Sequence, residues 1–280
     1  MATQTATARQ NPGLLSSALR VFDLSIGEML WSRRTIFMAL MVGGPVVIAV
    51  ILRLLVMLGG APRVEGVAMG GPAIFGMLIW VLYLRIIVPL LAIFYGTSLI
   101  ADEVEDKTIT YLFTRPIRRG AVLLGKYLAY FVVTSLVVLP SVMIVYLLVA
   151  PINGSLGAAF IPLLKDLALL AIGLGAYGAF FAFIGAKFKR PLLTGLIFVF
   201  GWEQLAMLIP GYLRKFTIIY YVQALVPHAM PQEGVVSLLQ GLFRETPSLA
   251  MSLFWLAVIW FGFLWLAART VERKEYVLEQ

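Results

Sequence analysis

The sequence predicts an all-α integral membrane protein with six transmembrane helices, an N-terminal amphipathic interfacial helix and an outer re-entrant element before the last span. Three observations support this fold class. First, 61% of the 280 residues are hydrophobic and 13% are charged, with a mean hydropathy of +0.95, outside the usual balance of soluble domains. Second, long uncharged runs recur near the ~20 residues that a helix needs to cross a bilayer. Third, the charged residues gather between these runs.

The first predicted element is an interfacial helix at residues 13–32. Its apolar residues recur at helical spacing, and charged residues occupy the opposite face. The apolar stripe consists of Leu15, Leu19, Phe22, Ile26 and Met29, and the polar face carries Arg20, Asp23 and Glu28. Two interpretations remain open, because the helix could simply hold the first span in place or could also contact a cytoplasmic partner.

Six spans are predicted, at about residues 35–58, 73–100, 120–150, 165–186, 191–209 and 248–268. The uncharged run at 127–164 is too long for one crossing, but Pro151, Asn153 and Gly154 interrupt it and begin an outer loop. The fourth and fifth spans are joined by a short turn, which makes them antiparallel neighbours. Glycines of the fourth span suit close helix packing, within the chain or between subunits.

Residues 210–247 form the largest predicted outer segment. It includes the apolar, aromatic stretch FTIIYYVQALVPHAM, which Pro227 and Pro231 interrupt. The stretch is too short to cross the bilayer, so interfacial or re-entrant helices fit better. We find no internal repeat or domain-separating linker and interpret residues 1–280 as a single membrane domain.

The basic residues orient the chain. With the N-terminus inside, most of the 22 Lys and Arg residues flank the inner ends of the spans, and the outer segments hold Arg63, Lys165, Arg214, Lys215 and Arg244. This bias predicts a multi-pass protein of the cell (inner or plasma) membrane with both termini in the cytoplasm. The net charge of +8 then reflects contact with anionic membrane lipids and requires no nucleic acid.

Charged residues enclose the predicted cytoplasmic loop at residues 101–119. The acids are Asp102, Glu103, Glu105 and Asp106, and the bases are Lys107, Arg115, Arg118 and Arg119. On a continuing helix, acids three or four positions apart share a face and repel each other by roughly 0.3 kcal/mol. A basic group is therefore expected opposite them.

The middle of this loop is apolar. The stretch TITYLFT is too short to span the membrane, and exposed apolar segments with charged rims mark interfaces. Pro116 disfavours helix at Arg115 and suits the first turn of the next helix. We interpret residues 101–119 as a docking element for a cytoplasmic partner, with a plain loop between spans as the alternative.

Residues in and around this loop resemble the signature of ABC-2 type permeases, the membrane subunits of a class of ATP-driven transporters. They are Gly96, Glu103, Thr108, Leu112, Pro116, Arg119, Gly125 and Lys126. The predicted topology is also similar to that family, so the resemblance covers most of the chain. Lys107 departs from the pattern, because the family commonly has glycine before Thr108.

The resemblance implies a half-transporter that pairs with a second permease copy, identical or not, and rests on a cytoplasmic ABC ATPase subunit. ATP and Mg²⁺ would be bound by that subunit, so this chain would hold no cofactor and would not be an enzyme. The implied coupling interface with the ATPase comprises Asp102, Glu103, Glu105, Asp106, Thr108, Arg115, Pro116, Arg118 and Arg119. The acids would meet basic groups on the ATPase.

Other chemical motifs fail on inspection. Residues 120–126 match the start of a P-loop, but Tyr127 stands where Ser or Thr must reach Mg²⁺. The sequence has no cysteine, and His228 is its single histidine, so thiolate and histidine-cluster metal sites are not expected. We therefore predict no catalytic residue and no metal site.

Arg85 and Glu203 are the charges within predicted spans that lack an obvious explanation. Such charges usually face the protein interior or water and pair with each other or with the backbone. A structural pair, snorkelling and a substrate-contacting role all remain open. The few polar groups in the spans favour an amphipathic or lipid-like cargo that is exported. The rival functions are a gradient-driven secondary transporter or channel, and a non-transporting scaffold for a cytoplasmic enzyme.

Overall fold

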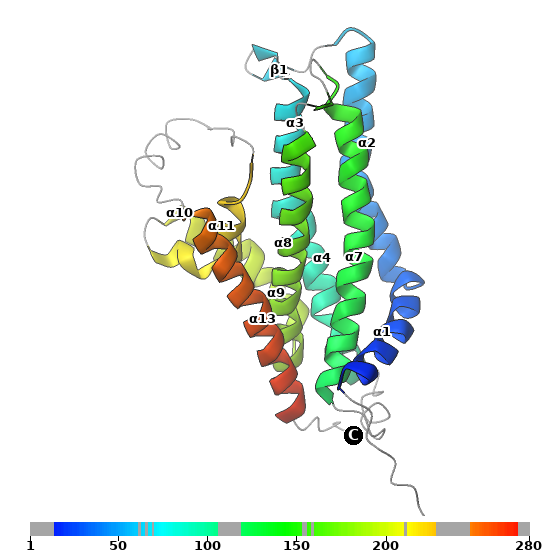
Figure 1. The fold of residues 1–280 in the computed structure, drawn as a ribbon, viewed down its shortest axis with the longest axis vertical. Coiled ribbons are helices and arrows are strands. Elements are labelled where there is room, and N and C mark those ends of the chain that lie inside the picture. Colours follow the sequence, from blue (N-terminus) through cyan, green and yellow to red (C-terminus); the bar gives the residue numbers. More distant parts are fainter. Residues whose placement is uncertain are drawn as a thin grey trace, which may run out of the picture.

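The computed structural model describes residues 14–60, 63–64, 67–68, 70–105, 119–152, 156–157, 160–209, 212–227 and 247–273. These residues form an elongated bundle whose long helices run up and down along the vertical axis of Figure 1. The connections between successive long helices lie at the two ends of the bundle, as expected for spans joined by short loops.

Five helices in the described part of the chain are long and apolar enough to cross a membrane. They are Arg34–Met57, Gly71–Glu103, Arg119–Val149, Phe160–Lys187 and Leu249–Arg273. The remaining predicted span, at 191–209, occurs as the shorter apolar helix Pro191–Met207. The helical fold class is confirmed, whereas the count of six spans stays a prediction.

The first two helices meet at a corner near the lower end of Figure 1. Helix α1 (Leu14–Leu30) leads into α2 (Arg33–Met57), which runs to the opposite end. There Gly59 takes a left-handed conformation with a φ of 85°, which it can adopt because glycine has no Cβ to clash. This conformation ends the helix. A β hairpin with two-residue strands follows, in which β1 (Arg63–Val64) pairs antiparallel with β2 (Val67–Ala68). The sequence predicts only a turn here.

The second membrane helix is wider than an α-helix over much of its length. It consists of α3 (Gly71–Leu78), the π-helical segment η1 (Ile79–Ile87), α4 (Val88–Leu91), a second π-helical segment η2 (Ala92–Gly96) and α5 (Ser98–Glu105). Pro89 lacks an N–H and removes one hydrogen bond from this helix. Because π-helical turns are rare and are frequent at functional sites, this helix is a candidate for function.

The centre of the bundle lies where α7 (Arg119–Val149) and α13 (Leu249–Arg273) pack on α8 (Phe160–Lys187). Small residues on α8 allow this close packing. The Tyr130 ring lies directly against Gly178, and Trp260 lies against Gly175. The hydroxyl of Tyr130 donates to the carbonyl of Leu174 at 2.9 Å. These glycines therefore serve packing within the chain.

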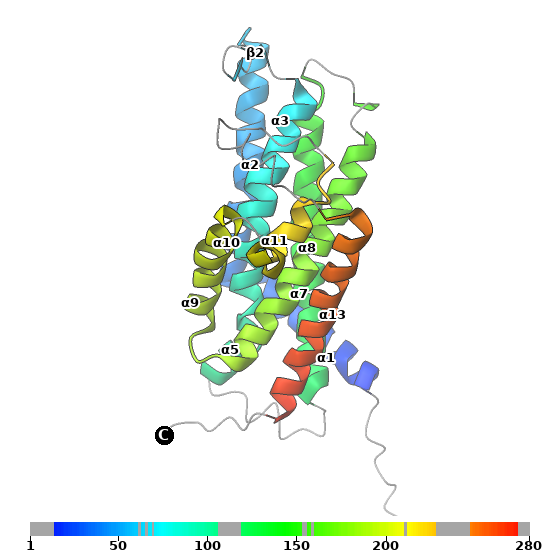
Figure 2. The same ribbon diagram turned by 90° about the vertical axis from the view of Figure 1, so that its left-hand side faces the viewer.

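The segment after α8 begins beside α5 and rises to mid-height, where it stays well below the β strands (Figures 1 and 2). It comprises α9 (Pro191–Leu196), the π-helical segment η4 (Ile197–Glu203), α10 (Gln204–Leu208), the 3₁₀ turn η5 (Tyr212–Phe216) and α11 (Ile218–Gln223). Ile209 is extended, as expected for a residue before proline. The re-entrant element stays a prediction, because residues 228–246 lie outside the described residues.

Candidate functional site

The lower end of the bundle in Figure 1 brings together α1, the start of α2, the end of α5 and the start of α7. Residues 106–118 connect α5 to α7 and lie outside the described residues. The predicted loop begins at the end of α5 and finishes at the start of α7.

Glu103 near the end of α5 forms an ion pair with Lys126, which lies two turns into α7. Their side chains are 18% and 11% exposed, respectively. Because the pair is largely shielded from water, its attraction is screened less than that of a surface pair. The pair connects the second and third membrane helices just inside the point where the chain leaves both of them.

Asp102, the preceding residue, pairs with a different helix. Its carboxylate lies 2.5 Å from the guanidinium of Arg34 at the start of α2. Adjacent residues on a helix point about 100° apart, so Asp102 and Glu103 reach different cations on different helices. The basic groups expected opposite the acids thus belong, for these two residues, to the same chain.

The corner between α1 and α2 positions Arg34. Ser32, with extended backbone, is the N-cap of α2, and its hydroxyl donates to the carbonyl of Met29 at 3.1 Å. The hydroxyl of Thr35 donates to the same carbonyl. These bonds satisfy a carbonyl at the end of α1 and hold the corner closed.

Glycine 125 explains how α1 lies so close to α7. A Cβ at this position would lie 2.5 Å from the carbonyl oxygen of Ala18 and 2.7 Å from the Cβ of Val21. Ala18, Ser17 and Ser25 of α1 are buried in this contact region. Helix α1 thus packs against the third membrane helix, and both interpretations of the N-terminal helix stay predictions.

Glycine 96 permits a second close approach, between the end of η2 and α8. Its Cβ would lie 3.0 Å from the Cβ of Phe181 and 3.2 Å from the carbonyl of Gly178. One turn further along α8, Gly185 lies directly against the backbone of Thr97. The lower end of the second membrane helix is thus packed closely on α8.

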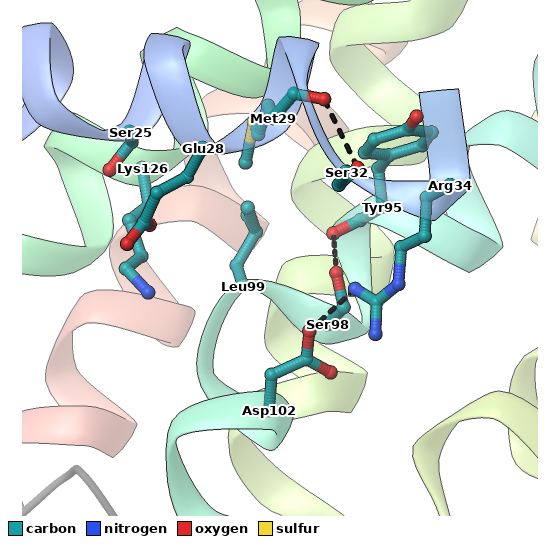
Figure 3. Close-up of a pocket in the computed structure, with 10 residues that line it drawn as sticks. All are labelled: Ser25, Glu28, Met29, Ser32, Arg34, Tyr95, Ser98, Leu99, Asp102 and Lys126. Carbon is teal, nitrogen blue, oxygen red and sulfur yellow. Dashed lines mark hydrogen bonds and ion pairs between the residues drawn. The ribbon is translucent and has the colours of Figure 1, made fainter. Parts of the chain in front are cut away.

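A pocket of about 300 Å³ opens between α1, the start of α2, the second membrane helix and α7 (Figure 3). Its lining includes both acids and bases, together with three serine hydroxyls. The lining residues are Ser25, Glu28, Met29, Ser32, Arg34, Tyr95, Ser98, Leu99, Asp102 and Lys126. Figure 3 shows Arg34 reaching Asp102 on one side of the pocket. Lys126 lies on the opposite side.

The structure places some of the predicted interface residues and not others. Asp102 and Glu103 pair within the chain as described, Glu105 ends α5, and Arg119 begins α7. The predicted residues outside the described part of the chain are Asp106, Thr108, Arg115, Pro116 and Arg118. Arg34 is a site residue that sequence reasoning missed, although the unbalanced acids indicated that a base must lie nearby.

Glu203 is a buried acid with a full set of donors. It is 2% exposed, and its carboxylate accepts hydrogen bonds from the Tyr177 hydroxyl at 2.9 and 3.1 Å. It also accepts from the backbone N–H groups of Ile218 at 3.0 Å and Ile219 at 3.3 Å, the first residues of α11. A carboxylate at a helix N-terminus satisfies free N–H groups. Glu203 therefore joins η4, α8 and α11.

Arg85 does not pair with Glu203 in the structure. Its guanidinium donates to the side-chain oxygen of the neighbouring residue Gln204, at 2.5 Å. Arg85 is exposed on the surface of the chain, whereas Glu203 faces the interior. The two charges are thus separated, and each has a neutral partner.

The described residues contain no group of three or more His, Cys, Asp or Glu side chains that could hold a metal ion. His228 lies outside the described residues. The two ion pairs at the lower end of the bundle connect α5 with α2 and with α7.

The chain was compared with known proteins. The sequence model of one protein family, described as ABC-2 family transporter protein, matches residues 5–271. Among the described elements, the match covers α1, the acids at the end of α5 and the long membrane helices, apart from the last two residues of α13. Comparison with curated proteins gave no match.

Proposed function

The chain belongs to the ABC-2 family of transporter proteins, and we propose that it is the permease subunit of an ATP-driven transporter. ATP is hydrolysed on a separate cytoplasmic ABC ATPase subunit, and residues 102–119 receive the movement of that subunit. The family assignment and the five apolar helices support a membrane permease. The coupling role is our inference from the inner end of the bundle.

The observation that carries the proposal is the Glu103–Lys126 ion pair beside the Asp102–Arg34 pair. The segment 106–118 is held at α5 on one side and at α7 on the other. A force on this segment enters both helices, and the ion pairs extend it to α2 and, through the corner at Ser32, to α1. A plain loop between spans would not need charged groups from three helices at its ends.

The movement then travels along the second membrane helix. Its inner end is packed on α8 through Gly96 and Gly185, so the two helices form one body at this level. Farther along, π-helical segments η2 and η1 offer wide turns, where a helix can change register. We propose that the push from the ATPase is converted there into a rearrangement facing a second permease copy.

The remaining parts of the proposal follow from composition. Both termini lie in the cytoplasm of a cell whose inner or plasma membrane holds the protein, because basic residues concentrate at one end of the predicted spans. A second copy, identical or not, completes the pathway. The cargo is amphipathic or lipid-like and is exported, because the spans contain few polar groups.

The test uses the complex of the full chain with its ATPase, reconstituted in liposomes. Glu103→Lys and Lys126→Glu each place like charges together, so we expect each to abolish cargo-stimulated ATP hydrolysis and transport. The double variant restores opposite charges and should recover most of both activities. Lys189→Glu is the matched control, because it makes the same change at an exposed inner position.

Three outcomes would overturn the coupling role. Wild-type stimulation in both single variants would show that the pair does not transmit movement. Equal loss in Lys189→Glu would show a general effect of inner-surface charge. Transport that ignores ATP and stops when an ionophore collapses the ion gradient would favour a secondary transporter instead.

A further inference from the structure

Arg85 lies in the middle of the second membrane helix, within the long apolar segment Gly71–Glu103. It is the single charged residue between Gly71 and Ala101, and its side chain is exposed on the surface of the chain. A cation that faces lipid at such a depth is costly, so intramembrane charges face a polar cavity, a partner group or a ligand. Among the described residues, Arg85 meets no acidic group, so its exposed guanidinium is free to take an anionic partner.

We propose that Arg85 and Gln204 bind the anionic group, a phosphate or a carboxylate, of an amphiphilic cargo. This inference rests on the proposed function, which is transport of a cargo. It deepens that function by proposing that the cargo is anionic. The binding face is formed by η1, which carries Arg85, and by the junction of η4 with α10, which carries Gln204.

The hydrogen bonding of Arg85 leaves its charge uncompensated in the described part of the chain. Gln204 accepts one hydrogen bond from the guanidinium at 2.5 Å, but an amide is neutral. A guanidinium has five N–H donors in a planar fork that matches phosphate and carboxylate oxygens. Gln204 thus orients the fork and leaves further donors for an anion.

Both residues are positioned by π-helical segments. Arg85 lies inside η1, and Gln204 directly follows η4 on the neighbouring helix. π-helical turns are rare, and they are frequent at functional sites. Two such segments on facing helices, with a hydrogen bond between them, are difficult to explain by packing alone.

The surroundings of the pair are apolar. Ile86, Trp202 and Leu205, its sequence neighbours, are all exposed large hydrophobic residues. A small soluble anion would find one cation and one amide in a greasy surface. An amphiphile, by contrast, can place its charged group on Arg85 and its apolar chain on these side chains.

A second copy of this chain is a poorer partner for Arg85. Among the described residues, the acids of the apolar helices away from their lower ends are Glu203 and Asp166, and both are buried inside their own chain. A second copy therefore has no described intramembrane acid to present at its surface. A subunit contact remains a distinct outcome of the test.

The test measures lipid retention by the purified full chain in nanodiscs, read by native mass spectrometry after release. The probes are phosphatidylglycerol, phosphatidylcholine and oleate in separate preparations. We expect wild type to retain phosphatidylglycerol and oleate over phosphatidylcholine, and Arg85→Gln to lose this preference by about ten- to a hundredfold, as for one hydrogen bond to a charged group. Arg85→Lys keeps the charge and should retain part of the preference.

Arg53→Gln is the matched control, because it removes another arginine from a membrane helix without touching the pair. Equal retention of the three lipids by wild type, unchanged preference in Arg85→Gln, or equal loss in Arg53→Gln would each overturn the proposal. Displacement of the bound lipid by millimolar inorganic phosphate would show a free-anion site and would also overturn it. A change in oligomeric mass without a change in lipid preference would identify a subunit contact instead.

The assay needs neither ATP nor an ATPase, so its failure is distinguishable from failure of the proposed function. A permease that shows no ATP-driven transport can still select anionic lipid at Arg85. Conversely, an ATP-coupled permease that is indifferent to lipid charge would keep its function and lose this site. Thermal unfolding of each variant, which should match wild type within a few degrees, shows that the compared proteins are folded.

Discussion

Glu103 on α5 and Lys126 on α7 form an ion pair that joins the second and third membrane helices directly inside the segment 106–118. Both residues belong to the pattern that resembles ABC-2 permeases, and their contact gives that pattern a physical reason. A largely shielded pair holds its two helices at a fixed distance more firmly than an exposed pair does.

Lys126→Met should destabilise the isolated permease by about 3 kcal/mol, because it removes one partner of a largely buried pair and leaves the Glu103 carboxylate without this cation. The double variant Glu103→Gln, Lys126→Met should recover much of the loss, because neither charge then remains. Thermal and denaturant unfolding of the purified protein measures both effects. If the losses of stability in Glu103→Gln and Lys126→Met simply add in the double variant, the two residues are not coupled.

Arg34→Gln should cost much less, about 0.5 kcal/mol, because the Asp102–Arg34 pair is exposed and exposed pairs contribute little. The side chains of Arg34 and Asp102 are 43% and 37% exposed, respectively. High salt should weaken this contribution further, since exposed charges are screened. Unfolding of wild type and variant at low and high ionic strength checks the prediction. A loss as large as that of Lys126→Met would contradict it.

Gly125→Ala should separate α1 from α7. The added Cβ would meet the backbone of Ala18 and the side chain of Val21, and overpacking of this kind costs about 1–3 kcal/mol. We expect faster hydrogen exchange and proteolysis in Leu14–Leu30, with the membrane helices unchanged. Gly262→Ala is the matched control, because nothing lies within 4 Å of the corresponding Cβ. Equal exchange of α1 in both variants would argue against the close contact.

Hydropathy predicts the membrane helices well because burial in lipid demands long apolar runs. Helix α7 covers Arg119–Val149 where 120–150 is expected, and α2 covers Arg33–Met57 where 35–58 is expected. The α8 helix begins earlier than expected, at Phe160, because Lys165 and Asp166 interrupt the apolar run without interrupting the backbone. A charge limits what can lie in lipid but does not end a helix.

The partners of the charges within the membrane helices are harder to predict than the helices themselves. Arg85 and Glu203 are plausible partners by sequence, but each π-helical turn inserts a residue and rotates the rest of the helix by about 100°. The segment η4 ends at Glu203, which faces the interior, while Gln204 reaches Arg85. Hydropathy carries no signal for such insertions. The Glu103–Lys126 pair is equally hard to predict from the sequence, because it depends on how α5 and α7 face each other.

Glu203 holds the N-terminus of the short helix α11. Its carboxylate accepts from the N–H groups of Ile218 and Ile219 and from the Tyr177 hydroxyl. Thr217, the N-cap of α11, makes no capping bond with its own side chain, so Glu203 takes over that role. Glu203→Leu leaves three buried donors unpaired, and each such donor costs about 1–3 kcal/mol.

We therefore expect Glu203→Leu to release α11 from α8 and η4, with faster hydrogen exchange across residues 212–227. Tyr177→Phe removes one donor and leaves the backbone contacts in place, so it should change exchange little. Glu203→Gln keeps a carbonyl oxygen for the backbone N–H groups and should fall between the two. Because α11 packs on α13 as well as on α8, some protection should survive even in Glu203→Leu. If exchange of residues 218 and 219 is the same in all variants, Glu203 does not hold this helix in place.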